Sequence, residues 1–401
     1  MVLLLCVTFS PTALVYDERF FVPNIFLLRD LGFGRQFLSE MASQVPGPLY
    51  QLIHVSLSWL TALQVPAMRF VNPAFLLGSM FLLAALVAAD WIDSRNLTIG
   101  ASLLAMPMVW KTAGMALTEI PAIFFAILMI YLWRWTNQCI DTVMVWRALI
   151  WAGACGLAYA LAVIGRQNYA VLIVPVVFYL LGRDQLRLRL LSVGSFLLCA
   201  APLPLYVFWV WGGVLPPLST DYGRHGLNLN WWAAFRDLGY IGVTAIVIFP
   251  GWRVPQRTLI RIGLAGGLLT VANWYFGWWR VVPLEAVVTK RFPESVGAGL
   301  SVVFPCALSV IGLTFAWRLW MHWREQVEDR LMAFSAVAIA CLLATSLRMG
   351  GDGSRYAVCY LPFVVLLCNR AMVGGLSGSL RFLGMATIGC LSLLSFYSGA
   401  Q

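Results

Sequence analysis

Long apolar runs separated by short polar breaks extend through almost the whole chain. An α-helix needs about 20 apolar residues to cross the hydrocarbon core of a bilayer, and many of these runs approach that length. The pattern predicts an all-α, polytopic membrane helix bundle that forms one domain over residues 1–401. We predict about thirteen transmembrane helices, near residues 1–15, 69–89, 97–114, 120–136, 147–164, 168–182, 190–211, 238–251, 259–279, 298–317, 331–348, 356–370 and 381–398.

The first apolar run, Met1 to Val15, has neither a basic start nor a small-x-small cleavage site before Tyr16, as a secretory signal would. We therefore expect a retained helix. Its 15 residues are fewer than a perpendicular span needs, which indicates either local bilayer thinning or a true start upstream of Met1.

The segment from Leu49 to Val65 is apolar but carries a histidine, two glutamines and several hydroxyl side chains, and Pro46 and Pro48 precede it. We interpret it as an interfacial helix rather than a span. It then lies in a large first external loop, residues 16–68, and the next helix begins on the external side.

Composition supports a membrane protein, with 61% hydrophobic residues, 11% charged residues and a mean hydropathy of +0.83. The 9 cysteines show no CxxC spacing or cluster with histidine, so we expect neither disulfides nor a metal site from them. The net charge of +10 favours anionic lipid or an anionic substrate as a partner. Nucleic acid is not expected, because no basic run is interleaved with stacking aromatic residues outside the apolar segments.

Arginine clusters at residues 183–189, 253–261 and 318–330 fall in breaks on one side of the predicted bundle. The positive-inside rule assigns that side to the cytoplasm. By parity, the breaks at 16–68, 212–237, 280–297 and 349–355 are then extracytoplasmic or lumenal. The protein is expected in a bacterial inner membrane or the endoplasmic reticulum.

Polar residues at helix ends gather on that external side: Asp17, Glu18, Lys111, Glu119, Arg166, Gln167, Asp352, Arg355 and Tyr356. A carboxylate at a membrane boundary faces water, a partner or a substrate, since exposing it to hydrocarbon costs several kcal/mol. Glycosyl transfer to a hydroxyl needs such a carboxylate as a base, and a phosphate leaving group needs cations. We predict Asp17 as the base, with Glu18 in support.

Six segments in a fixed order carry a family resemblance: YDERF, VPGPLYQL, AMRFVNPAFLL, MALTEIPAIFF, GRQNYAVL and GDGSRYAVCY. The order resembles the GT-C superfamily of polyprenol-dependent membrane glycosyltransferases, and most of all the alpha-1,2-glucosyltransferase that caps the lipid-linked oligosaccharide. The resemblance covers most of the first 180 residues, and beyond them only Arg355 and Tyr360 match.

The resemblance implies a GT-C-like fold, a polyprenyl-phosphate sugar as donor, a glycan or lipid-linked acceptor, and inverting transfer. It adds Tyr50 to the substrate-binding candidates, which are Arg166, Gln167, Arg355, Tyr356, Glu119, Lys111, Tyr50 and Asp352. Asn168-Tyr169 departs from the family's Thr-Asn, so the donor sugar and acceptor are not carried over. No DxD motif occurs, and we expect no metal or other cofactor.

Simpler roles stay open for several of these residues. Arg166 ends an apolar helix and is equally explained by a snorkelling side chain, while Glu119 begins a helix where any acid favours the dipole. For the whole chain, the alternative is a transporter or flippase of a lipid-linked or small anionic solute. Two related halves with matching discontinuous helices would favour it, and the sequence shows no such symmetry.

Overall fold

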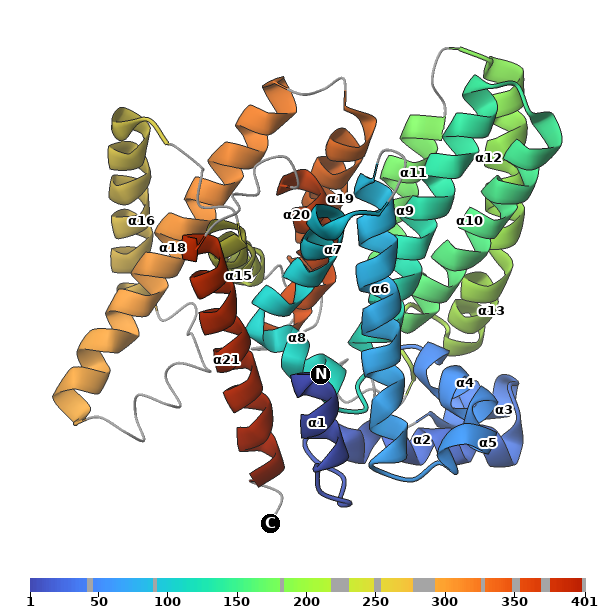
Figure 1. Cartoon of the computed structure of the whole chain (residues 1–401), viewed down its shortest axis with the longest axis horizontal. Helices are drawn as coiled ribbons and strands as arrows, with labels where there is room; N and C mark the ends of the chain where they lie inside the picture. The colour runs from blue at the N-terminus through green and yellow to red at the C-terminus, as the bar shows by residue number, and fades with distance from the viewer. Residues whose placement is uncertain are drawn as a thin grey trace. The chain divides into compact units, whose positions relative to one another are not determined.

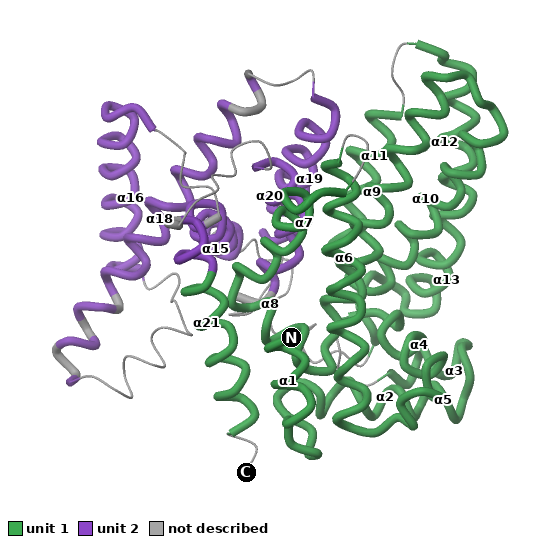
Figure 2. The backbone as a smooth tube through the Cα atoms, in the orientation of Figure 1, with its two compact units in different colours: residues 1–224, 383–401 green, residues 225–382 purple. Residues whose placement is uncertain are grey.

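The computed structural model describes residues 1–41, 46–88, 92–180, 184–217, 231–248, 254–276, 293–325, 329–347, 354–368 and 376–398, and these residues form helices without any strand. They group into two compact units, residues 1–224 with 383–401 and residues 225–382 (Figure 2). The predicted all-α membrane fold is confirmed, and the single membrane domain over residues 1–401 stays a prediction.

Six helices of the described chain are long and apolar enough to cross a membrane: Ala67–Val87, Glu119–Asp141, Val145–Gly165, Gln256–Phe276, Val302–Met321 and Gly378–Ser398. Each lies on a predicted span. A seventh span is formed if α12 (Leu186–Ala200) and α13 (Pro202–Trp211) are taken together, since they are bent by 41° at the break between them. Pro202 and Pro204 explain the break, because proline donates no backbone hydrogen bond.

Other predicted spans are shorter or interrupted. The range 97–114 is three pieces, α7 (Ser94–Ala101), η2 (Ser102–Ala105) and α8 (Pro107–Gly114), and Pro107 begins the last of them. The first predicted span, 1–15, contains only α1 (Val2–Thr8). The predicted number of thirteen spans therefore stays a prediction.

The centre of the first unit is formed by α9 (Glu119–Asp141), α10 (Val145–Gly165) and α12, with α6 (Val71–Val87) against α9 (Figure 1). Small residues allow α10 and α12 to approach closely. A Cβ on Gly156 would lie 2.2 Å from the Phe196 carbonyl oxygen, so only glycine fits there. After α10, the chain continues through η3 (Gln167–Leu172) into α11 (Ile173–Leu180).

Four short helices fill the predicted first external loop: α2 (Glu18–Leu31), α3 (Arg35–Glu40), α4 (Leu49–Ser56) and α5 (Ser58–Thr61). They gather at one end of α6, which η1 (Ala67–Phe70) precedes (Figure 1). At 8 and 4 residues, α4 and α5 are each too short to cross a bilayer. This geometry agrees with the interfacial interpretation of residues 49–65.

The second unit contains α15 (Trp231–Ile248), α16 (Gln256–Phe276), α18 (Glu294–Glu325), α19 (Arg330–Ser346), η4 (Ser354–Tyr360) and α20 (Leu361–Cys368). Helix α18 packs along both α15 and α16. Gly239 and Gly242 on α15 face α18, where an added Cβ would lie within 3 Å of the side chains of Leu308 and Ile311 respectively. The C-terminal helix, α21 (Leu376–Ser398), belongs to the first unit from Leu383 onward.

Candidate functional site

A buried ion pair joins the start of α2 to η1, the short helix that leads into α6. Arg69 Nε donates to Glu18 Oε1 at 2.8 Å, and Arg69 Nη2 donates to Glu18 Oε2 at 2.6 Å. Both residues are 0% exposed. The parallel pair of bonds is the bidentate geometry that a guanidinium offers a carboxylate, and it is stronger than a single contact.

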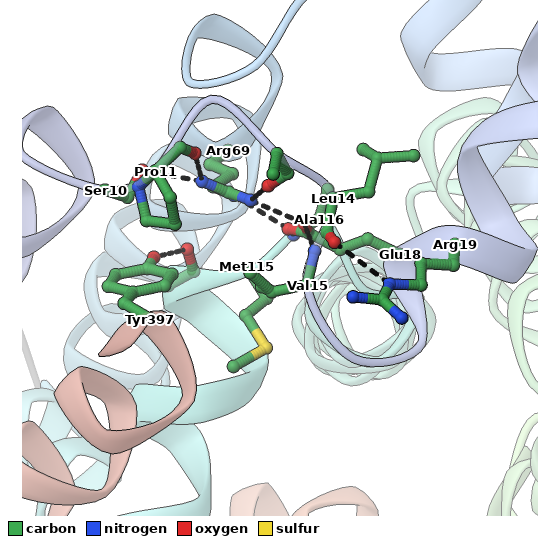
Figure 3. Close-up of polar contacts among 12 residues, drawn as sticks. Ser10, Pro11, Leu14, Val15, Glu18, Arg19, Arg69, Met115, Ala116 and Tyr397 are labelled. Carbon is green, nitrogen blue, oxygen red and sulfur yellow. Dashed lines mark hydrogen bonds and ion pairs between the residues drawn. The ribbon is translucent and has the colours of Figure 1, made fainter. Parts of the chain in front are cut away.

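Backbone N–H groups occupy the remaining acceptor sites of this carboxylate. Val15 N–H donates to Oε2 at 2.9 Å, and Ala116 N–H donates to Oε1 at 2.8 Å (Figure 3). Each oxygen of Glu18 thus accepts two bonds, which is its full capacity. Glu18 therefore has no acceptor site left for a substrate proton, and its bonds fix the chain on either side of Asp17.

Arg69 also fixes the segment that leads into the acidic pair. Its Nη1 donates to Ser10 Oγ at 2.8 Å and to the Pro11 carbonyl, and its Nη2 donates to the Ala13 carbonyl at 2.8 Å (Figure 3). All five guanidinium N–H groups are therefore used. The chain from Ser10 to Glu18 follows a course set by one arginine.

Asn72, one helical turn after Arg69, fixes the turn between α8 and α9. Its Nδ2 lies within hydrogen-bonding distance of the carbonyl oxygens of Thr112 (3.1 Å), Met115 (2.7 Å) and Leu117 (2.8 Å). This turn carries Ala116, which binds Glu18, and it leads into Glu119. The MRFVN and MALTE segments are thus joined by side-chain-to-backbone bonds.

Asp17 lies near the end of this fixed segment, as the residue before α2. It is half-buried, in contrast to the enclosed Glu18. Tyr16 before it adopts a left-handed conformation with φ of 51°, which a non-glycine residue keeps only when its surroundings impose it.

Those surroundings include Lys111 on α8. Its Nζ lies 3.6 Å from the ring centre of Tyr16 and 3.8 Å from that of Phe396, and the two rings are edge to face with centres 5.2 Å apart. Lys111 is 5% exposed. Contact with two aromatic faces stabilises a buried ammonium group, so Lys111 holds the backbone beside Asp17, and its predicted substrate-binding role stays a prediction.

Tyr50 and His54 lie on α4, which packs against α2. Their ring centres are 4.4 Å apart, and Tyr50 packs on Phe21 of α2 at 6.1 Å. Burial, and then the nearby charge of Glu18, raises the pKa of Tyr50 well above its usual value. Burial lowers the pKa of His54 to about 3, so this histidine is neutral and is neither a general acid nor a cation at neutral pH.

A second buried ion pair links Glu119, the first residue of α9, to Arg166, the residue after α10. Arg166 is 3% exposed and does not snorkel to a surface, so that alternative is wrong. Gly47 brings the first loop against this pair, since a Cβ there would lie 2.1 Å from the Ile164 carbonyl oxygen. Arg166 and Glu119 as substrate ligands stay a prediction, as does Gln167, which is half-buried at the start of η3.

The remaining predicted site residues belong to the second unit. Arg355 and Tyr356 lie in η4, where Tyr356 is half-buried and the side chain of Arg355 is outside the described residues, as is all of Asp352. The first unit therefore contains Asp17, Glu18, Tyr50, Lys111, Glu119 and Arg166. Contacts place Lys111 against Tyr16, the neighbour of Asp17, and pair Glu119 with Arg166. The role of Arg355 stays a prediction.

Sequence reasoning missed a buried polar network in the second unit. Ser346 Oγ donates to Asp237 Oδ2 at 2.7 Å, and the Tyr360 hydroxyl contacts Asp237 Oδ2 at 3.4 Å and the Leu342 carbonyl at 3.2 Å. An acid at the edge of the predicted span 238–251 was the available signal, since such residues are rare without a partner. The network anchors the end of η4, the element that carries Arg355.

The described residues contain no group of three or more histidine, cysteine, aspartate or glutamate side chains arranged to hold a metal ion. The first unit contains the half-buried carboxylate of Asp17 on a fixed backbone. It also contains the buried cations Lys111 and Arg166. Such an arrangement suits proton abstraction from a hydroxyl beside an anionic group.

No protein-family profile and no curated protein sequence matches this chain. Among solved structures, ArnT from Cupriavidus metallidurans in the apo state is similar, with 14% sequence identity over 93% of this chain and 75% of that chain and a TM-score of 0.43. ArnT from the same organism bound to undecaprenyl phosphate is similar at 13% identity, over 92% and 75% of the two chains, with a TM-score of 0.41. The functional roles proposed below rest on the side chains of this protein and their contacts.

Proposed function

We propose that this protein is a membrane glycosyltransferase that moves a sugar from a polyprenyl-phosphate donor to a glycan or lipid-linked acceptor on the extracytoplasmic or lumenal side. The observation that carries the proposal is the fixed course of residues 10–18, in which Glu18 is locked by Arg69 and Asp17 alone of the acidic pair keeps a half-buried position. The GT-C-like order of the sequence segments supplies the reaction class.

Asp17 acts as the general base in this proposal. Its carboxylate takes the proton of the acceptor hydroxyl, the hydroxyl oxygen attacks the anomeric carbon, and the bond from that carbon to the phosphate oxygen breaks. A single displacement of this kind inverts the anomeric centre. The lipid phosphate leaves with the bonding electron pair, and the buried cations Lys111 and Arg166 are the candidates in the first unit that stabilise its charge.

The test is turnover of Asp17→Asn in a membrane fraction supplied with a panel of polyprenyl-phosphate sugars. Loss of a proton acceptor should lower turnover roughly 10²- to 10⁴-fold with little change in donor binding. Asp30→Asn is the matched control, because Asp30 lies on the same α2 helix and its side chain is 61% exposed. Near-wild-type turnover in Asp17→Asn would show that the base is another residue.

The side of the membrane is tested by labelling single cysteines with an impermeant maleimide. Trp59 on α5 is 80% exposed and is expected outside, while Arg187 on α12 is exposed and is expected in the cytoplasm. A cysteine at Trp59 should react in sealed cells or vesicles of the correct orientation, and one at Arg187 only after permeabilisation. The reverse pattern would place the candidate site on the cytoplasmic side and refute the proposed sidedness.

A further inference from the structure

The end of α21 packs on α8 through one face of the helix. A Cβ on Gly389 of α21 would lie 2.3 Å from Trp110 Cδ1, and a Cβ on Gly114 of α8 would lie 2.4 Å from Leu393 Cδ2, so the two helices touch at both positions. Leu393 is 0% exposed. Residues three and four positions further along a helix share its face, so residues 396–397 continue the same contact.

Phe396 supports the residue immediately before Asp17. Its ring centre lies 3.8 Å from Lys111 Nζ and 5.2 Å from the ring centre of Tyr16, and Lys111 Nζ lies 3.6 Å from the centre of that same Tyr16 ring. The three groups thus contact one another pairwise. Tyr16 has a φ of 51°, a conformation that a non-glycine residue keeps only under constraint. Phe396 therefore helps to fix the backbone that leads into Asp17.

Tyr397 supports, through Arg69, the residue immediately after Asp17 (Figure 3). Its ring centre lies 5.3 Å from Arg69 Cζ, within the range of a cation–π contact, and its hydroxyl donates to the Gly114 carbonyl. Tyr397 is 6% exposed. Arg69 in turn binds both carboxylate oxygens of Glu18, so a shift of the guanidinium group would be passed on to the residue after Asp17.

We propose that Phe396 and Tyr397 are positioning residues for the transfer reaction, because these consecutive side chains of α21 hold the two neighbours of Asp17 and so set the direction of its carboxylate. This inference rests on the proposed function, in which Asp17 is the general base. A base must lie about 2.6–3.2 Å from the hydroxyl oxygen that it deprotonates, and a displacement of about 1 Å lowers the rate on the order of 10²-fold. Both side chains act through their neighbours rather than on the substrate.

The kinetic arm of the test uses the full chain in membranes, with the polyprenyl-phosphate sugar that the parent protein accepts. Phe396→Leu and Tyr397→Leu should each lower kcat roughly 10- to 100-fold with little change in the donor KM, because the base is displaced while the donor is still bound. Phe396→Tyr keeps an aromatic ring at this position and should restore most of the turnover. Leu391→Ala is the matched control on α21, because Leu391 is 61% exposed, and it should turn over at the parent rate.

The second arm measures the segment itself, without turnover. Hydrogen exchange of the full chain in detergent is followed by mass spectrometry in peptides that cover residues 10–20 and residues 145–165 of α10. Both leucine variants should speed exchange in residues 10–20, where Val15 N–H is bonded to Glu18, and should leave α10 at the parent rate. The exposed control should match the parent protein in both segments.

Three results would overturn this inference and leave the proposed function standing. Faster exchange in both segments would mean that α21 stabilises the whole unit rather than the surroundings of Asp17. Parental exchange in residues 10–20 would mean that the contacts do not hold this segment. Faster exchange there with a parental kcat, or with a change confined to the donor KM, would mean that the contacts do not position the base. Absence of transfer by the parent protein with every donor would instead refute the proposed function and the positioning role together.

Discussion

Replacing Arg69 by methionine should destabilise the first unit severely, because this one side chain holds three parts of the chain together. The variant removes two bonds to Glu18, one to Ser10 and two to backbone carbonyls, while methionine keeps much of the arginine's apolar volume. What is left is a carboxylate that is 0% exposed, held by two backbone N–H groups without a counter-charge.

The expected cost follows from that unpaired charge. Removing one partner of a buried ion pair costs about 3–5 kcal/mol, since the remaining charge loses its partner and stays out of water. Glu18→Gln should cost about as much, because it leaves the Arg69 guanidinium buried without its counter-charge and places an amide donor where two N–H groups now point. The double variant Glu18→Gln/Arg69→Met contains no buried unpaired charge, so its cost should be smaller than the sum of the two single costs.

The assay is thermal unfolding of the purified protein in detergent, followed by tryptophan fluorescence and by loss of the monodisperse peak in size-exclusion chromatography. Arg69→Met should lower the unfolding midpoint on the order of 10 °C. Arg29→Met is the control, because Arg29 forms an ion pair with Asp30 in which the side chains are 52% and 61% exposed. Exposed pairs contribute about 0–1 kcal/mol, so this variant should melt close to the parent protein.

Two results would refute the reasoning. Equal midpoints for Arg69→Met and Arg29→Met would mean that the Glu18 carboxylate is not buried against Arg69 in the folded protein. Strict additivity in the double variant would mean that the two side chains do not interact.

Three further predictions follow from the packing of the first unit. Lys111→Met should lower turnover and, in the same melting assay, destabilise the protein by roughly 0.5–2 kcal/mol, because it removes the ammonium from two aromatic faces. Gly156→Ala should lower the unfolding midpoint, since its Cβ would overlap a backbone carbonyl of α12. In the control Gly194→Ala the new Cβ meets nothing within 4 Å, so this variant should raise the midpoint slightly. Equal shifts in the two variants would contradict the contact between α10 and α12. The pKa of His54 is about 3 in the folded protein and 6.5 in the unfolded chain. Between these two pH values only the unfolded chain binds the proton, so the free energy of unfolding should fall as the pH drops from 6.5 towards 3. His54→Leu should remove that part of the pH dependence, and an unchanged pH profile would show that this histidine is not buried.

Tertiary structure determines the surroundings of a polar residue at a helix end, as Lys111, Glu119 and Arg166 show. The sequence placed each of them at a boundary, where a solvated cap, a snorkelling side chain and a substrate ligand look alike. In the structure all three are at least 95% buried, with Lys111 against two aromatic rings and Glu119 paired with Arg166. Partners that are 47 residues apart, or 285 in the case of Lys111 and Phe396, have no local signal in the sequence.

The sequence alone determined the solvent, the helical class and the approximate position of the long spans. Hydropathy is a local property, and a run of about 20 apolar residues satisfies its own backbone hydrogen bonds in lipid only as a helix, so α6, α9, α10, α16 and α21 lie where the pattern predicted them. It also singled out the acidic pair Asp17-Glu18, because charge at a membrane boundary is costly.

Only the tertiary structure decided how the members of that pair differ. Glu18 is enclosed because Arg69, Val15 and Ala116 converge on it from three segments, and Asp17 is left half-buried one residue away. The same is true of the bond from Tyr397 to the Gly114 carbonyl, which neither local segment gave a reason to expect. The physical reason is common to both cases: long-range contacts are made between side chains whose distance depends on how helices pack, and packing depends on the shapes of all the surfaces that meet.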